Sequence, residues 1–307
     1  DIVLGTRSAV FAPLEDLGMI ILDEEHESSY QSEDPPRYHA RDAAKFLCAQ
    51  QNAILVLGSA TPSVETTFQA QKGVYQKLIL RSRFNRQPLP RVVIADMREE
   101  VRAGSAGVIS TPLRRELEEN LTRGEQSILF LNRRGSSRML LCGECGERPE
   151  CPRCSVPLTY HSANGRLMCH YCGHSERVAR QCPECGGLMK QVGAGTQKVE
   201  EELKELFPAA GVLRMDADTV SGNHEALLDK FDKEKIPILL GTQMVAKGLD
   251  FENVTLVGVV AADLGLYVDN YHAAERTFSL LTQVVGRAGR GSKDGRAVIQ
   301  TYTPDNE

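Results

Sequence analysis

Eight of the nine cysteines lie in one central stretch of the chain, in four Cys-x-x-Cys pairs: Cys142/Cys145, Cys151/Cys154, Cys169/Cys172 and Cys182/Cys185. The two thiolates of such a turn bind one metal ion, and zinc takes four ligands of this kind at the corners of a tetrahedron. We therefore predict two structural zinc ions, in preference to redox-active dithiols. Because thiolates fill all four positions, neither ion is expected to activate water.

Loop lengths indicate which pairs share an ion. The second and third pairs are separated by fourteen residues, 155–168, which is close to the usual zinc-ribbon spacing, whereas only five residues, 146–150, separate the first and second. This favours a nested arrangement. The inner cluster is Cys151, Cys154, Cys169 and Cys172, and the outer cluster is Cys142, Cys145, Cys182 and Cys185. His161, His170 and His174 are alternative ligands, but eight cysteines already fill two sites.

A second chemical motif follows the apolar run Met19–Leu22, which ends in Asp23-Glu24-Glu25-His26. An apolar strand that delivers acidic side chains at its carboxyl end is how many phosphate sites hold magnesium. We predict that Asp23 holds Mg²⁺ and that Glu24 orients or deprotonates the attacking water, with Glu25 and His26 in the same catalytic set. The alternative is an acidic strand end in a surface loop.

Three further motifs point to nucleotide chemistry. Gly58-Ser59-Ala60-Thr61 follows the apolar run 54–57, and a later strand candidate is followed by Gly248. Near the end, Arg287 and Arg290 lie four and seven residues after Gln283. Arginine stays charged and grips phosphate oxygens in bidentate fashion, so this spacing suits a γ-phosphate sensor, although such pairs are commonly surface charge. In this order, the motifs predict an ATP-driven motor.

The elements that position these motifs alternate between two patterns. The predicted strands are Ile2–Gly5, Met19–Leu22, Ile54–Gly58, Val92–Ala95, Ser127–Leu131, Val212–Met215, Ile236–Gly241, Val254–Ala261 and Ala297–Tyr302. The predicted helices are Ala40–Gln51, Pro62–Gln71, Thr111–Arg123, Lys198–Leu206, Asn223–Lys233 and Ala273–Val285. Strand–helix alternation with near-continuous apolar strands predicts an α/β fold of parallel sheets covered on both faces.

Composition limits the classes of protein. The 307 residues suggest about two domains, and the chain is 41% hydrophobic and 25% charged, as in an ordinary soluble protein. A net charge of −5 gives no global basic field for nucleic acid. No apolar stretch reaches the roughly 18 residues of a membrane span, and no secretory signal is visible. The chain opens at Asp1 rather than at Met, which we interpret as a fragment or a truncated reading frame.

The order of the elements predicts a domain plan. Residues 1–80 are expected to form part of a first lobe, and 81–111, with Pro88 and Pro90, a linker. Residues 112–140 and 191–307 are expected to form a second lobe, with the cysteine module 141–190 inserted in it. Because this module has few apolar residues besides its cysteines, it needs metal to fold.

The motif set as a whole resembles the superfamily 2 helicases, and it is most similar to the PriA family of replication-restart helicases. The resemblance is carried by the four motifs above and by the cysteine insertion directly after Ile128-Leu129-Phe130-Leu131-Asn132-Arg133-Arg134-Gly135. It is also carried by Gly5–Ala9, Tyr38–Asp42, Gly241–Met244, Ala246–Gly248 and Ala274–Arg276. It covers essentially the whole chain and implies two RecA-like lobes, the first of them partial.

The resemblance implies a 3′→5′ DNA helicase fuelled by ATP, acting at stalled forks and recruiting primosome proteins. It assigns Thr6 and Arg7 to the DNA backbone, Tyr30 and Tyr38 to a loop that senses DNA, and Ser59 and Thr61 to coupling. Gln283, Arg287 and Arg290 would close over ATP. The implied partners are forked and single-stranded DNA, single-strand-binding protein and replisome loaders, with no membrane. The implied state is a monomer in the bacterial cytoplasm, associated with the nucleoid.

Three departures from the family pattern carry expectations of their own. The chain does not contain the family's phosphate loop, so we expect it to hydrolyse no ATP alone. The loop 28–37 is poor in aromatic residues, which predicts weaker coupling to DNA. Glu147-Arg148-Pro149 replaces a usually apolar stretch, which predicts looser packing there. The alternatives are a non-enzymatic zinc-dependent binding module on a degenerate motor and, more distantly, a different superfamily 2 translocase.

Overall fold

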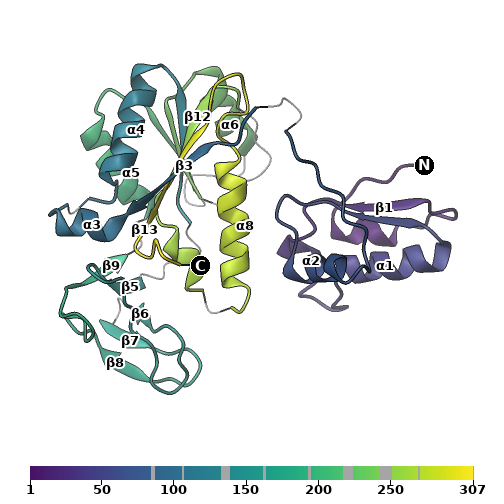
Figure 1. Ribbon diagram of the computed structural model, residues 1–307, viewed down its shortest axis with the longest axis horizontal. Helices are drawn as coiled ribbons and strands as arrows, with labels where there is room; N and C mark the ends of the chain where they lie inside the picture. Colours follow the sequence, from purple (N-terminus) through teal and green to yellow (C-terminus); the bar gives the residue numbers. More distant parts are fainter. Residues whose placement is uncertain are drawn as a thin grey trace. The chain divides into compact units, whose positions relative to one another are not determined.

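A computed structural model describes most of the chain. The described residues are 1–83, 87–105, 107–132, 139–161, 164–192, 195–216, 224–242, 251–268 and 270–306. They form two compact units, Asp1–Leu80 and Arg81–Glu307, and each is described here by itself (Figure 1). Among the described residues, no helix has the length and apolar character needed to cross a membrane.

The first unit is a small parallel sheet with helices. Its elements are the 3-10 helices η1 (Arg7–Phe11) and η2 (Ser28–Tyr30), the strands β1 (Met19–Leu22) and β2 (Ile54–Leu57), and the helices α1 (Ala40–Gln51) and α2 (Val64–Gln71). The strands pair in parallel from Met19↔Ile54 to Leu22↔Leu57. Helix α1 connects them and ends at Asn52, whose φ of 53° is left-handed. The parallel register brings the residues that follow β1 and β2 to the same edge of the sheet.

The second unit holds the larger sheet and the cysteine module. Its helices are α3 (Met97–Arg102), α4 (Thr111–Thr122), α5 (Thr196–Leu206), α6 (His224–Lys233), α7 (Asp263–Leu266) and α8 (Ala273–Val285). The main sheet contains β3 (Arg91–Asp96), β4 (Gln126–Phe130), β10 (Val212–Met215), β11 (Ile238–Gly241), β12 (Val254–Val259) and β13 (Arg296–Thr301). Its strand order is β10-β11-β4-β12-β13-β3, and every pairing is parallel.

Helices cover both faces of this sheet (Figure 1). On one face, Leu113 of α4 and Leu203 of α5 are fully buried with Leu129. On the other, Phe231 of α6 and Val284 of α8 pack with the neighbouring strand residue Ile128. Successive residues of β4 thus point into opposite cores, which explains why the central strands are apolar without alternation.

Most predicted elements are present in the structure, with two differences. Ile2–Gly5 is not a strand: it pairs with no described strand, and an apolar run without a partner has no reason to become one. The whole of the expected linker 81–111 lies in the second unit, where β3 pairs with β13 over six residues and α3 follows it. The prolines lie in 81–90, before the strand.

The cysteine module contains only short antiparallel strands. They are β5 (Met139–Cys142), β6 (Thr159–His161), β7 (Arg166–Met168), β8 (Ser175–Arg177) and β9 (Met189–Val192). Strands β5 and β9 pair and close the module at its base, and β6-β7-β8 form a three-stranded sheet. Its buried core has three residues other than cysteine, Leu140, Leu158 and Leu167, beside Cys151 and Cys169. A core of this size needs additional cross-links.

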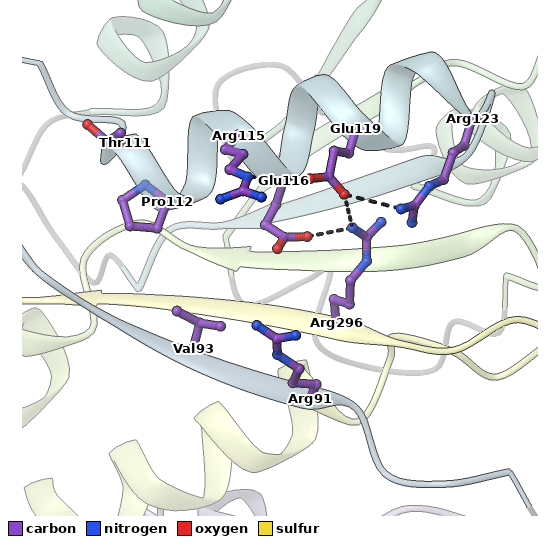
Figure 2. Close-up of a pocket in the computed structure, with 9 residues that line it drawn as sticks. All are labelled: Arg91, Val93, Thr111, Pro112, Arg115, Glu116, Glu119, Arg123 and Arg296. Atoms are coloured by element: carbon purple, nitrogen blue, oxygen red, sulfur yellow. Dashed lines mark hydrogen bonds and ion pairs between the residues drawn. The ribbon is translucent and has the colours of Figure 1, made fainter.

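A groove of about 500 Å³ runs between α4 and the neighbouring strands β3 and β13 (Figure 2). Arg296 of β13 reaches across it to Glu116 at 2.5 Å and to Glu119 at 3.4 Å. Glu119 also pairs with Arg123 at 3.1 Å. These ion pairs tie β13 to α4, and the predicted site residues lie elsewhere.

Candidate functional site

The eight paired cysteines gather into two groups of four. Each group is one of the nested sets that the loop lengths favoured, and its four sulfur atoms lie within 4.8 Å of one another. Sγ···Sγ distances are 3.4 Å for Cys142–Cys185 and 3.7 Å for Cys151–Cys172. Zn–S bonds of about 2.3 Å at tetrahedral angles place sulfur atoms about 3.8 Å apart. The donor set and its spacing therefore fit structural zinc, and the histidines are not part of either group.

Backbone amides favour a thiolate at one cysteine of each cluster. The N–H groups of Cys172 and Tyr171 hydrogen-bond to the sulfur of Cys169 and, against the opposing effect of burial, lower the pKa of Cys169 to about 7. Burial raises the pKa of Cys142, but the N–H groups of Cys145 and Glu144 lower it to about 7 overall. Burial raises the pKa of Cys145 to about 12, and a hydrogen bond with Cys172 raises the pKa of Cys154 to about 12. In each cluster, one thiol is therefore favoured as the thiolate, the form that binds zinc.

The outer cluster lies against the body of the second unit. Gly146, with a φ of 81°, approaches so closely that a Cβ there would lie 2.8 Å from the Tyr302 carbonyl oxygen. Arg102 of α3 donates to the Glu144 carbonyl at 2.8 Å. The Arg148 guanidinium lies 4.4 Å from the ring centroid of Tyr267, and burial raises the pKa of that phenol. Glu147 is exposed and Arg148 and Pro149 are half-buried, so the looser packing expected at 147–149 stays a prediction, with Arg148 in contact with Tyr267.

The acidic motif occupies a tight turn directly after β1. Glu24 has a φ of 49°, and its backbone N–H donates to Asp23 Oδ1 at 3.0 Å. Asp23 is exposed at the carboxyl end of the strand. Glu24 Oε2 makes no hydrogen bond within the described residues and lies 3.6 Å from His26 Nδ1. Two carboxylates at a strand end, one of them with a buried oxygen that makes no hydrogen bond to the described residues, fit the hard oxygen ligation of Mg²⁺ and its waters.

Glu25 has a different position from its neighbours, because its carboxylate is enclosed by protein groups. It accepts hydrogen bonds from the Ser63 N–H at 2.7 Å and from Thr66 Oγ1 at 3.0 Å, and it pairs with Arg41 at 3.1 Å. Its side chain is fully buried. This network joins the acidic turn to α1 and to the start of α2. It therefore fixes the position of the turn relative to both helices.

His26 connects the acidic turn to the Gly-Ser-Ala-Thr segment. Its Nδ1 lies 2.7 Å from Ser59 Oγ, and Ser59 Oγ also accepts from the Thr61 N–H at 2.9 Å. Thr61 Oγ1 is buried and has no hydrogen-bond partner within the described residues. Since β1 and β2 are adjacent and parallel, the two motifs meet at one edge of the sheet.

Three of the four residues assigned to DNA contact form one cluster. Arg7 donates to the carbonyl groups of Ser29 and Gln31 at 3.2 and 2.6 Å, and its guanidinium lies 5.8 Å from the Tyr38 ring centroid. The Tyr30 hydroxyl donates to the Asp23 carbonyl at 2.7 Å. Burial and then the charge of Asp23 raise the pKa of Tyr30, so the phenol remains a donor. Thr6 precedes η1, and its carbonyl accepts from the Ala9 N–H.

In the second unit, the predicted phosphate-sensing residues share one helix end. Gln283 lies in α8, which ends at Val285, and Arg287 and Arg290 lie in the turn that follows. Arg290 Nε donates to the Gly286 carbonyl at 3.1 Å. Gly248 lies outside the described residues.

Sequence reasoning missed four residues that support these motifs. Arg41, Ser63 and Thr66 hold Glu25, and Tyr267 stacks with Arg148. Arg41 did stand within a stretch that carried the family resemblance, but nothing in its spacing indicated a buried ion pair. Contacts of this kind depend on residues 16 to 119 positions apart, so no local pattern reveals them.

A parallel α/β lobe with a zinc-binding insertion defines the chain as part of a RecA-like helicase motor. Two family models agree with this class. Residues 151–177 match the PriA DNA helicase Cys-rich region domain, and residues 190–292 match the helicase conserved C-terminal domain.

Whole-chain comparisons identify the family. The replication restart protein PriA of Bacillus subtilis (strain 168) is 54% identical over 99% of this chain and 38% of its own length. PriA of Haemophilus influenzae is 45% identical over 99% of this chain and 42% of its own length. The chain belongs to the PriA family and spans about two fifths of the length of these relatives. Yeast Dbp5 L327V bound to RNA and ADP BeF3 aligns over 94% of this chain and 54% of its own, with 15% identity and a TM-score of 0.43.

Proposed function

We propose that this chain carries motor motifs and the zinc module of an ATP-dependent 3′→5′ DNA helicase that acts in replication restart and primosome assembly. The observation that carries the proposal is the 2.7 Å contact between His26 and Ser59, which joins an acidic metal-binding turn to a hydroxyl-bearing strand end. The names of the relatives give the biological setting. The match of residues 190–292 to the helicase conserved C-terminal domain supports the proposal for the second unit.

The catalytic roles follow from positions in each unit. Asp23 would hold Mg²⁺ through its exposed carboxylate, and Glu24, whose Oε2 makes no hydrogen bond within the described residues, would orient the attacking water. Magnesium bound to ATP supplies charge neutralisation at the phosphates. Gln283, Arg287 and Arg290 sense the γ-phosphate from the turn after α8. Glu25 acts by position alone, since its carboxylate is enclosed by Arg41, Ser63 and Thr66.

Coupling to DNA runs through the cluster around η2. Arg7 fixes the loop by its carbonyl groups, and Tyr30 bonds directly to the backbone of Asp23. A strand of DNA that stacks on Tyr38 or displaces Arg7 therefore changes the acidic turn through one hydrogen bond. Thr6 contributes a backbone contact next to it. This route from DNA to the acidic turn is short and depends on only two tyrosines, Tyr30 and Tyr38. It is therefore compatible with a loop that has few aromatic residues.

The two zinc sites have different roles in this scheme. The outer cluster attaches the module to the motor lobe, while the inner cluster carries the surface that meets DNA and protein partners such as single-strand-binding protein and replisome loaders. The protein works as a monomer near the nucleoid in the bacterial cytoplasm.

The test is ATP hydrolysis and unwinding by the full-length protein that carries this sequence, assayed on forked DNA and on partial duplexes with 3′ or 5′ tails. Glu24→Gln is expected to lower DNA-stimulated hydrolysis at least about 100-fold, the usual contribution of a positioned base. The matched control is Glu15→Gln at an exposed position. Hydrolysis that is indifferent to DNA, or to Glu24→Gln, contradicts the proposal.

A further inference from the structure

Arg83 lies on the segment that enters the second unit, and its side chain is engaged by the turn after α8. Its Nη1 donates to the Gly289 carbonyl at 3.2 Å and its Nη2 to the Gly286 carbonyl at 3.3 Å. The two residues it holds are more than 200 positions away in the sequence. The two terminal nitrogens of one guanidinium thus bridge two carbonyl groups of the turn that carries Arg287 and Arg290.

Three carbonyl groups of the last turn of α8, those of Thr282, Val284 and Val285, accept hydrogen bonds from N–H groups of the turn that follows. The last carbonyl groups of an α-helix have no intrahelical partner and form the negative end of its dipole. Arg83 adds donors to the carbonyl of the C-cap residue Gly286 and to the carbonyl of Gly289 in the turn. Its guanidinium reaches both with a fixed fork, whereas an ammonium offers only a point charge. Arg83 therefore stabilises both the end of α8 and the conformation of the turn behind it.

The rest of the turn is held by close backbone contacts. The Gly289 N–H donates to the Val254 carbonyl at 3.0 Å, and Gly289 has a φ of 66°. A Cβ on Gly289 would lie 2.4 Å from the Gly295 nitrogen, and one on Gly291 would lie 2.4 Å from the Glu252 carbonyl oxygen. Strand β12 and the residues before β13 thus fix one side of the turn, and Arg83 fixes its carbonyl groups.

Arg83 and Arg290 are brought together by this arrangement. Both guanidinium groups donate to the same Gly286 carbonyl, Arg290 at 3.1 Å. Burial and then the charge of Arg290 lower the pKa of Arg83. Two like charges beside one carbonyl repel each other, and an anion that approaches them relieves this repulsion.

We propose that Arg83 is a positioning residue that holds the turn bearing Arg287 and Arg290 in the conformation that meets the γ-phosphate. The chain leaves the first unit at Leu80 and enters the second at Arg81, so Arg83 lies on the covalent connection between the units. A displacement of this segment would be transmitted to the turn that bears Arg287 and Arg290 through the two hydrogen bonds of Arg83. The proposal deepens the proposed helicase function and rests on it for its catalytic consequence.

Two measurements test it. Amide hydrogen exchange of the 307-residue chain, followed by mass spectrometry, reports the stability of residues 286–291 without any nucleotide. Steady-state ATP hydrolysis by the full-length protein reports kcat and KM. Arg83→Ala removes both hydrogen bonds and the charge. Arg83→Lys keeps the positive charge but cannot bridge the two carbonyl groups, so comparing the two variants separates the effect of positioning from the effect of charge. Arg81→Ala is the matched control, since Arg81 is exposed and has no hydrogen bond to the described residues.

We expect Arg83→Ala and Arg83→Lys to speed exchange in 286–291 by about 10-fold. We expect the same variants to lower kcat by about 10-fold with little change in the KM for ATP, a small part of what a catalytic arginine contributes. Exchange, or kcat, that matches Arg81→Ala overturns the proposal. If the unmutated protein hydrolyses no ATP, the proposed function fails, and the exchange measurement alone decides whether Arg83 holds the turn.

Discussion

The stacking of Arg148 on Tyr267 offers a direct test of how the zinc module is attached to the motor lobe. Arg148→Ala, Tyr267→Ala and the double variant form a double-mutant cycle, which isolates the energy of the pair from other effects of each change. The control is Arg153→Ala, an exposed residue of the same module for which the described part of the chain provides no ion pair.

The expected coupling energy follows from the geometry. The guanidinium lies 4.4 Å from the ring centroid, well inside the range of a cation–π contact. The Arg148 side chain is 28% exposed and also pairs with Glu150 at 2.9 Å, so the contact is only partly desolvated. Exposed pairs contribute about 0.5–1 kcal/mol and desolvated ones about 2, so we expect about 1 kcal/mol here.

The assay is amide hydrogen exchange of residues 143–150 in the zinc-loaded chain. A coupling energy of about 1 kcal/mol corresponds to a roughly fivefold change in the local opening equilibrium. Each single variant should loosen the segment, and the double variant should add little to either. Strictly additive effects, or loosening equal to that in Arg153→Ala, would refute the idea that this pair attaches the outer cluster.

Three further predictions concern the metal, the buried network and the DNA loop. Metal analysis should find two zinc ions per chain and one after Cys151→Ser; one or none in the unmutated chain contradicts the two clusters. Glu25→Ala should lower the unfolding free energy of the first unit by about 3 kcal/mol in urea denaturation because it leaves Arg41 unpaired, whereas exposed Asp42→Asn should change it by under about 0.5 kcal/mol. Tyr30→Phe should weaken DNA stimulation of hydrolysis by the full-length protein about fivefold, as expected for one hydrogen bond; unchanged stimulation removes this path.

Hydrophobic patterning predicted the secondary structure well because the core strands are buried on both faces. Helices α1 and α8 begin and end where the sequence indicated, and most other elements differ by one or two residues. Ile2–Gly5 was predicted to be a strand and is not one in the structure. Strand propensity describes how side chains fit a half-buried sheet, and it does not supply the neighbouring strand.

Tertiary structure separated the acidic motif into different roles. From the sequence, Asp23 was predicted to hold Mg²⁺ and Glu24 to orient the attacking water, and Glu25 and His26 were placed in the same catalytic set. The turn directs Glu25 into a buried network and His26 towards Ser59. Such divergence depends on backbone dihedral angles, here the positive φ of Glu24, which no residue pattern encoded.

The sequence by itself determined the ligands, the motifs and the family, because metal and phosphate chemistry demand particular side chains at short, fixed spacings. The nested cysteine sets could be inferred from loop lengths for the same reason. Only the tertiary structure decided the strand order, the edge position of β3, the stacking of Arg148 on Tyr267 and the contact of Arg83 with the turn after α8. These contacts join residues that are far apart along the chain, so they exist only after the sheet has assembled.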